Sequence, residues 1–77
     1  MKIYIDKKIM AINLHNLMDS HRISAEELRR EIRNITLNTI KRWRRGYSLP
    51  TLAHLILLSN YFNVPIDSFL SYTINRT

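Results

Sequence analysis

The sequence contains no cysteine, only one glycine and only two prolines among its 77 residues. Without cysteine the chain can form neither a disulfide framework nor a thiolate zinc site, so its fold depends on packing alone or on packing plus a partner subunit. It also lacks the roughly 18 consecutive apolar residues of a membrane span and the apolar centre of a signal peptide. A chain of 77 residues has room for a single domain, predicted over residues 1–77. Without a membrane span or signal peptide, the expected location is the cytoplasm.

Negative charge is scarce as well. Six acidic residues stand against twelve Lys and Arg, which gives a net charge of +6, and eight of the twelve basic residues lie between Arg22 and Arg45. Positive charge concentrated in one segment of a small domain favours a polyanionic partner, most often nucleic acid. A solvated basic surface is the alternative interpretation of the charge alone.

Hydrophobic spacing and capping residues predict five helices. Ser24 and Glu27 have the S-x-x-E form of a capping box, in which Ser24 accepts from the Glu27 N–H while Glu27 reaches back to the N–H of Ser24. Thr36 and Thr51 are further N-cap candidates, and Gly46, the lone glycine, is expected to be a left-handed C-cap. The predicted helices cover about residues 7–20, 24–33, 37–45, 52–62 and 66–71, so we expect a compact, five-helix, all-α domain.

The segments between and before these helices carry weaker patterns. Residues 2–6 alternate, with Ile3 and Ile5 on one side, which predicts either a short N-terminal strand or an ordered arm. Asn34 tolerates the left-handed conformation of a tight turn, and Asn63 is expected to close the fourth helix. Residues 71–77 have no clear pattern.

The third predicted helix divides into two faces at about 100 degrees per residue. Ile40 and Trp43 fall on one side and are expected to be buried. The opposite arc consists of Leu37, Asn38, Lys41, Arg42 and Arg45. Four cations within residues 41–45 repel one another, which is mildly destabilising unless an anion relieves it. Such an arc offers long cations for phosphates and shorter groups for base edges.

These motifs, in this order, resemble the Cro/repressor-type (XRE) helix-turn-helix family over about Leu14 to Leu70. The resemblance is carried by residues 23–28 (ISAEEL), 35–46 (ITLNTIKRWRRG), 49–55 (LPTLAHL) and 62–70 (FNVPIDSFL). It implies a repressor-like fold in which the second and third helices form the reading unit. The third helix is then expected to lie in the major groove of double-stranded DNA.

The resemblance also implies roles for individual residues. The positions expected to contact bases are Leu37, Asn38, Lys41 and Arg42. The positions expected to contact the DNA backbone are Thr36, Thr39, Arg45, Tyr47 and Ser48, with packing as the alternative role of Thr39. The chemistry agrees, because Asn38 can pair bidentately with adenine, Arg42 can do so with guanine, and Leu37 can pack against a thymine methyl group.

The chain departs from the family pattern at four places. Ala25 stands where the family often has Gln, and Arg29 stands where a small residue usually lies at the helix crossing. The turn between the second and third helices is one residue longer. Arg44 replaces a common acid, and the usual arginine partner of that acid falls near Met18, so both ends of the ion pair are lost together.

The sequence therefore predicts a transcriptional regulator that binds duplex DNA as a homodimer on two half-sites about one turn apart. Family analogy favours a small repressor of phage or mobile-element type that acts by occupying its operator. Candidate dimer surfaces are the Ile3/Ile5 segment and the end of the fifth helix with Phe69 and Tyr72. No metal site is expected, because the three histidines lack metal-ligand spacing. No enzyme activity, cofactor or small-molecule ligand is expected either, because the sequence offers no phosphate loop and no nucleophile with an obvious base.

Two alternatives remain open from the sequence. The first is a protein-interaction module on the same fold, such as an antitoxin or antirepressor, with weak DNA binding that ignores sequence. The second is a basic domain that binds membranes or RNA. Membrane binding favours exposed aromatic residues beside the cations, whereas Trp43 is expected to point inward. RNA readers usually present stacking aromatic side chains, and few are available here.

Overall fold

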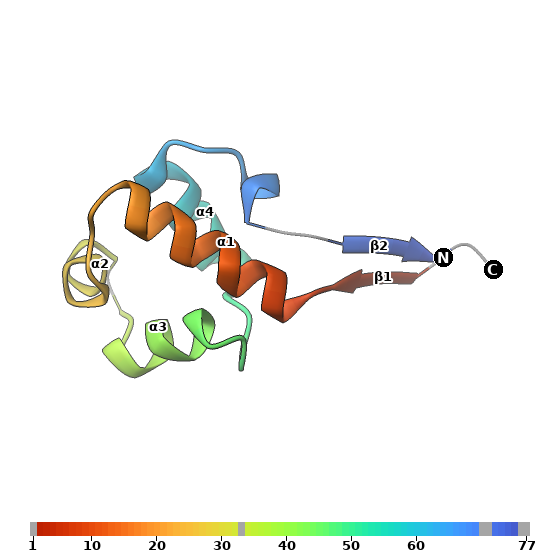
Figure 1. The fold of residues 1–77 in the computed structure, drawn as a ribbon, viewed down its shortest axis with the longest axis horizontal. Helices are drawn as coiled ribbons and strands as arrows, with labels where there is room; N and C mark the ends of the chain where they lie inside the picture. Colours follow the sequence, from red (N-terminus) through yellow and green to blue (C-terminus); the bar gives the residue numbers. More distant parts are fainter. Residues whose placement is uncertain (1, 33, 70–71, 76–77) are drawn as a thin grey trace.

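The computed structural model describes residues 2–32, 34–69 and 72–75, and the side chains of residues 5–32 and 34–69. Within these residues, four α-helices and a short 3-10 helix make up the body of the molecule (Figure 1). Their bounds are α1 Lys7–Ser20, α2 Ala25–Glu31, α3 Leu37–Arg44, α4 Leu52–Phe62 and η1 Ile66–Ser68. Two short antiparallel strands, β1 Lys2–Ile5 and β2 Tyr72–Asn75, precede and follow the helices.

Each α-helix begins at a side-chain oxygen that accepts a hydrogen bond from the first turn. Asp6 accepts from the backbone N–H of the second residue of α1 at 2.9 Å. Ser24, Thr36 and Thr51 each accept from the N–H three residues further on, at distances of 3.1 to 3.2 Å. Because an N-cap of this kind contributes about 1 kcal/mol, these four residues fix where the helices start.

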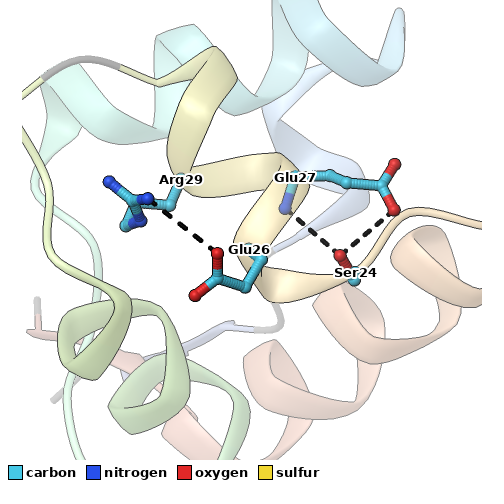
Figure 2. Close-up of polar contacts among 4 residues, drawn as sticks. All are labelled: Ser24, Glu26, Glu27 and Arg29. Atoms are coloured by element: carbon cyan, nitrogen blue, oxygen red, sulfur yellow. Dashed lines mark hydrogen bonds and ion pairs between the residues drawn. The ribbon is translucent and has the colours of Figure 1, made fainter.

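The capping box at the start of α2 differs from the predicted one in a single bond. The N–H of Glu27 donates to Ser24 Oγ at 3.2 Å, as the sequence predicts. The carboxylate of Glu27, however, accepts from the Ser24 hydroxyl at 3.1 Å instead of from the Ser24 backbone (Figure 2). The hydroxyl proton is free to donate once Oγ accepts the backbone bond, so the two residues are joined side chain to side chain.

Three helices end on a residue in the left-handed conformation: Arg22 (φ 53°), Gly46 (φ 76°) and Asn63 (φ 55°). After α3, the N–H of Tyr47 donates to the carbonyl of Arg42 at 3.0 Å, which is the long bond of a Schellman motif. Gly46 adopts this conformation without strain, whereas a residue such as Arg22 carries about 1 kcal/mol of steric strain. The predicted C-caps at Gly46 and Asn63 are therefore present, and the one at Arg22 is additional.

The core lies between the four α-helices and η1. Its buried members are Met10, Leu14, Met18, Ile23, Leu28, Ile32, Ile40, Trp43, Leu55, Leu58, Phe62 and Phe69. Among the residues whose side chains the structure describes, no polar or charged residue is buried. The interior of the described body is therefore apolar, and no disulfide contributes to it.

The turn between α2 and α3 is anchored in the core by two isoleucines. Helix α2 ends at Glu31, not near residue 33 as predicted, because Ile32 is extended (φ −104°, ψ 115°) and 97% of its surface is removed from solvent. Residue 33 lies outside the described part. Asn34 takes the expected left-handed conformation (φ 61°), and Ile35 packs against the core.

The predicted fifth helix, residues 66–71, is instead the single 3-10 turn η1. Its bonds run from the N–H of Ser68 to the carbonyl of Pro65 at 2.9 Å and from the N–H of Phe69 to that of Ile66 at 3.0 Å. No side chain caps this turn, and it delivers Phe69 into the core, where the ring is fully buried. Residues 70 and 71 lie outside the described part.

The strands β1 and β2 pair in an antiparallel register that runs from Lys2 opposite Asn75 to Ile5 opposite Tyr72. The molecule measures 43 × 23 × 20 Å. Figure 1 shows the strand pair extending away from the helices along the longest of these axes. Strand β2 falls in the segment for which the sequence shows no pattern. None of the described helices is long and apolar enough to cross a membrane.

Candidate nucleic-acid interface

Helix α3 packs against α1 and α2. Ile40 is fully buried and Trp43 is 2% exposed, which confirms that both residues face the interior. The Trp43 ring lies 5.3 Å from the ring of His54 on α4. His54 itself is half-buried and bonds to the Thr51 hydroxyl at 3.0 Å, so it belongs to a helix cap.

The opposite face of α3 is open to solvent. Asn38, Lys41 and Arg42 are exposed, and Leu37 is half-buried at the start of the helix. Spacings of three and four residues place Asn38, Lys41 and Arg42 on one side of a helix. The structure thus brings the four predicted base-contacting residues together on α3 and leaves three of them exposed.

Thr36 and Thr39 lie at the amino end of α3. Thr36 Oγ1 accepts from the Thr39 N–H at 3.1 Å, and the two hydroxyl groups lie 2.8 Å apart. Thr36 is exposed and Thr39 is half-buried. Both hydroxyls are engaged in the cap, so any contact with a ligand would use their remaining lone pairs or the second hydroxyl proton.

Arg45, Tyr47 and Ser48 follow at the carboxyl end of α3. Arg45 is exposed, Tyr47 is 62% exposed and Ser48 is half-buried. The chain reverses at Gly46, where an added Cβ would lie 3.6 Å from the carbonyl oxygen of Lys7. The loop that carries the three predicted backbone-contacting residues therefore rests on the first turn of α1.

The departures from the family pattern on α2 do not disturb its packing. Arg29 pairs with Glu26 on the same helix, with Nη2 and Oε2 3.9 Å apart, and its side chain is 41% exposed (Figure 2). Leu28 provides the fully buried contact of α2, and Ala25 packs at the edge of the core. The large residue at the expected helix crossing therefore turns to solvent and leaves α2 seated against α3.

A pocket between α1 and α3 contains two residues that the sequence did not predict to be functional. His15, Lys41, Arg44 and Arg45 line this pocket, whose volume is about 300 Å³. Arg44 Nη2 donates to His15 Nδ1 at 2.9 Å. The sequence contained one signal for this contact. Met18 is the position expected to face Arg44, and His15 lies three residues before Met18 on the same helix. Met18 instead lies in the core, and His15 takes its place beside Arg44.

The positive charge of α3 has no neutralising partner within the described part of the chain. The one ion pair found there joins Arg29 and Glu26 on α2. Arg44 is half-buried, and its Nε is buried without a hydrogen-bond partner among the described residues. Because this Nε is shielded from solvent, an anion at the surface cannot bind it. The charges of Lys41, Arg42 and Arg45, which are exposed and have no ion-pair partner among the described residues, favour an external anion.

The helix-turn-helix family model (HTH_3) matches residues 14–69, a span that includes the second half of α1 and all of α2, α3 and α4. The chain belongs to the Cro/repressor-type (XRE) helix-turn-helix family. As a member, it is a DNA-binding helix-turn-helix regulator. The strands β1 and β2 of this helix-turn-helix protein lie outside the matched residues. Neither the curated proteins nor the solved structures gave a match.

Proposed function

We propose that the protein binds double-stranded DNA sequence-specifically by placing α3 in the major groove. The observation that carries this proposal is the division of α3. Ile40 and Trp43 fasten the helix to the body, while Asn38, Lys41 and Arg42 stay exposed on the other side. A helix held by one face and free on the other matches the docking geometry of a recognition helix.

The proposed base contacts follow from the chemistry of the exposed side chains. Asn38 pairs with adenine through its amide, and Arg42 pairs with guanine through its guanidinium group. Leu37, half-buried at the start of α3, packs against a thymine methyl group. Lys41 adds a further donor to the same part of the groove.

The proposed backbone contacts flank these residues at both ends of α3. Thr36 and Thr39 approach a phosphate at the amino end, where the helix dipole favours an anion. Arg45, Tyr47 and Ser48 approach the backbone from the loop at the other end. Contacts of this kind fix the register of the protein on the duplex and carry no sequence information of their own.

We further propose a homodimer on two half-sites that acts in the cytoplasm as a small repressor of phage or mobile-element type, by operator occupancy. A single short helix buries little surface, so a second subunit supplies affinity. Of the two candidate dimer surfaces, the one built on Phe69 and Tyr72 is weakened because Phe69 is fully buried. The side chains of Ile3 and Tyr72 lie outside the described part.

A protein-interaction module on the same fold, such as an antitoxin or antirepressor, remains the second candidate function. The observation that favours it is a group of exposed apolar residues on α4, namely Leu52, Ile56, Leu57 and Tyr61. Apolar side chains that gather on one element often mark a protein contact. This candidate predicts DNA binding that is weak and independent of sequence.

The decisive experiment is selection of binding sites from random duplex DNA at roughly 150 mM salt, where loose electrostatic binding is suppressed. Recovery of a two-fold symmetric motif supports both the specific function and the homodimer. Recovery of an asymmetric motif supports the specific function and contradicts the dimer. If no motif is enriched, the proposed sequence-specific function is wrong and the interaction module takes its place.

A further inference from the structure

The pocket between α1 and α3 gathers positive charge at one point of the surface. Lys41, Arg44 and Arg45 are spaced three and four residues apart, so they fall on one side of the helix end. His15 lies across from them on α1 and accepts from Arg44 Nη2 at 2.9 Å. These four side chains, among the described residues, line the pocket, whose volume is about 300 Å³.

Two observations indicate that an anion completes this arrangement. Within residues 5–32 and 34–69, no carboxylate lies within ion-pair distance of the three cations, because the one ion pair of that region is on α2. In addition, Arg44 lines the pocket and uses one Nη2 donor on His15, while its Nε is buried and does not face the pocket. A guanidinium carries five donors and no acceptor, so Arg44 has spare donor capacity next to an open pocket.

We propose that this pocket binds a single phosphate group, and that the phosphate belongs to the DNA backbone beside the groove that α3 enters. This inference rests on the proposed DNA-binding function. The planar fork of an arginine matches the geometry of a phosphate, and flanking lysine and arginine side chains add charge. Arg44 is the central binding residue and Arg45 adds a second cation, while Lys41, which also lines the pocket, keeps its proposed role at the bases.

His15 acts as a positioning residue in this site. Because a guanidinium only donates, Nδ1 of His15 is the acceptor in the bond to Arg44, and the ring proton lies on Nε2. The imidazole thereby holds the Arg44 side chain against α1 in one orientation. An arginine held in this way loses less rotamer freedom when it binds an anion.

The first test compares Arg44→Gln with Arg22→Gln, which removes the same charge at the far end of α1. Affinity for a duplex carrying the selected motif is measured by fluorescence anisotropy across a range of salt concentrations. We expect Arg44→Gln to weaken binding about tenfold or more, as for the loss of a charge-assisted hydrogen bond, and to reduce the salt slope by about one unit. If Arg22→Gln has an equal effect, net charge explains the loss and the pocket proposal is overturned.

The second test identifies the phosphate. Single neutral methylphosphonate linkages are scanned along the duplex against the wild type and Arg44→Gln. At one linkage, the neutral group should weaken wild-type binding but leave Arg44→Gln binding unchanged, which is the coupling expected of two groups in contact. Additive effects at every linkage contradict the proposal.

A third arm distinguishes the DNA backbone from free phosphate. Inorganic phosphate is titrated into the DNA-free protein while the NMR signals of His15 and Arg44 are followed. Shifts that Arg44→Gln abolishes, without coupling at any linkage in the duplex, would assign the pocket to free phosphate and overturn the DNA assignment. Coupling at one linkage supports the DNA assignment whether or not free phosphate also binds.

Two further variants keep the inference separate from the proposed function and from misfolding. His15→Ala changes an exposed residue and retains all three cations. We expect this variant to lose less affinity for the duplex than Arg44→Gln. His15→Gln offers an amide oxygen as acceptor and should restore part of that loss. If Arg42→Ala changes base preference while Arg44→Gln and His15→Ala behave like Arg22→Gln, only the pocket proposal fails and the proposed DNA-binding function stands. If the wild type selects no duplex at all, both proposals fail.

Discussion

The two faces of α3 differ in their exposure to solvent. Ile40 and Trp43 have almost no exposed surface, whereas Asn38 and Arg42, one or two residues away, are open to solvent. The buried face makes the apolar contacts that fold the chain, and the exposed face makes no ion pair among the described residues. Under the proposed function, stability and DNA recognition depend on different residues of one short helix, and mutation can separate them.

The largest expected effect comes from Trp43→Ala on the buried face. Truncating a buried tryptophan removes apolar contacts and leaves a cavity, which costs about 3–5 kcal/mol. That is a large share of the stability of a small domain, so we expect extensive unfolding at 37 °C. Urea denaturation followed by circular dichroism measures the loss. Arg42→Ala is the control, and a destabilisation of comparable size in that variant would contradict the division of the helix.

The next effect in size concerns base discrimination on the exposed face. We expect Arg42→Ala to lose about 1–3 kcal/mol of preference at one base-pair position, while its denaturation midpoint stays near that of the wild type. Arg45→Ala should weaken binding to all sequences alike and lower the salt slope by about one unit. Binding to a panel of single-base variants at several salt concentrations measures both. Identical behaviour of the two variants would show that these roles are wrongly assigned.

A smaller effect is expected at Thr36, the N-cap of α3. Thr36→Ala removes the acceptor for the Thr39 N–H, so we expect a loss of about 1 kcal/mol in the free energy of unfolding. Thr36→Ser keeps the hydroxyl and should stay close to the wild type. If Thr36 also contacts phosphate, Thr36→Ala weakens DNA binding beyond its effect on folding, whereas Thr36→Ser retains most of the affinity. Denaturation and anisotropy measured on the same samples separate the two contributions.

The smallest expected effect concerns the ionisation of Tyr61 on α4, away from the cationic face of α3. Desolvation, with the carboxylates of Glu31 and Glu27 adding to it, raises the pKa of the Tyr61 phenol above its ordinary value. The unfolded chain then ionises this phenol first, so stability is unaffected below about pH 10 and falls as the pH rises further. Tyr61→Phe should reduce this alkaline loss, and Glu31→Gln should lower the pKa in an absorbance titration of the phenols. An unchanged titration in Glu31→Gln would contradict the assigned cause.

Local features of the fold were predictable from the sequence because their causes are local. The N-caps at Ser24, Thr36 and Thr51 depend on one side-chain oxygen and a backbone group three residues away. The burial of Ile40 and Trp43 follows from helical spacing in a helix whose one other apolar residue, Leu37, is its first. In α4, by contrast, most residues are apolar, so the spacing could not show which of them would be exposed.

Features that depend on distant parts of the chain were not predictable in this way. The contact between His15 and Arg44 joins residues 29 positions apart on different helices. The pairing of β1 with β2 joins opposite ends of the chain, and neither strand shows a pattern that identifies its partner. The 3-10 turn η1 replaces a predicted helix, and Phe69, directly after it, packs against core residues from distant parts of the chain. Each of these depends on tertiary geometry that local spacing does not encode.

The pairing of β1 with β2 has a consequence for the order in which the molecule assembles and opens. These strands close a loop that contains every helix, and closing so long a loop is entropically costly until the helices have already drawn its ends together. Two strands alone are also marginally stable in water. The amide protons of β1 and β2 should therefore exchange with solvent faster than those of α1 or α4, so strand separation would precede global unfolding.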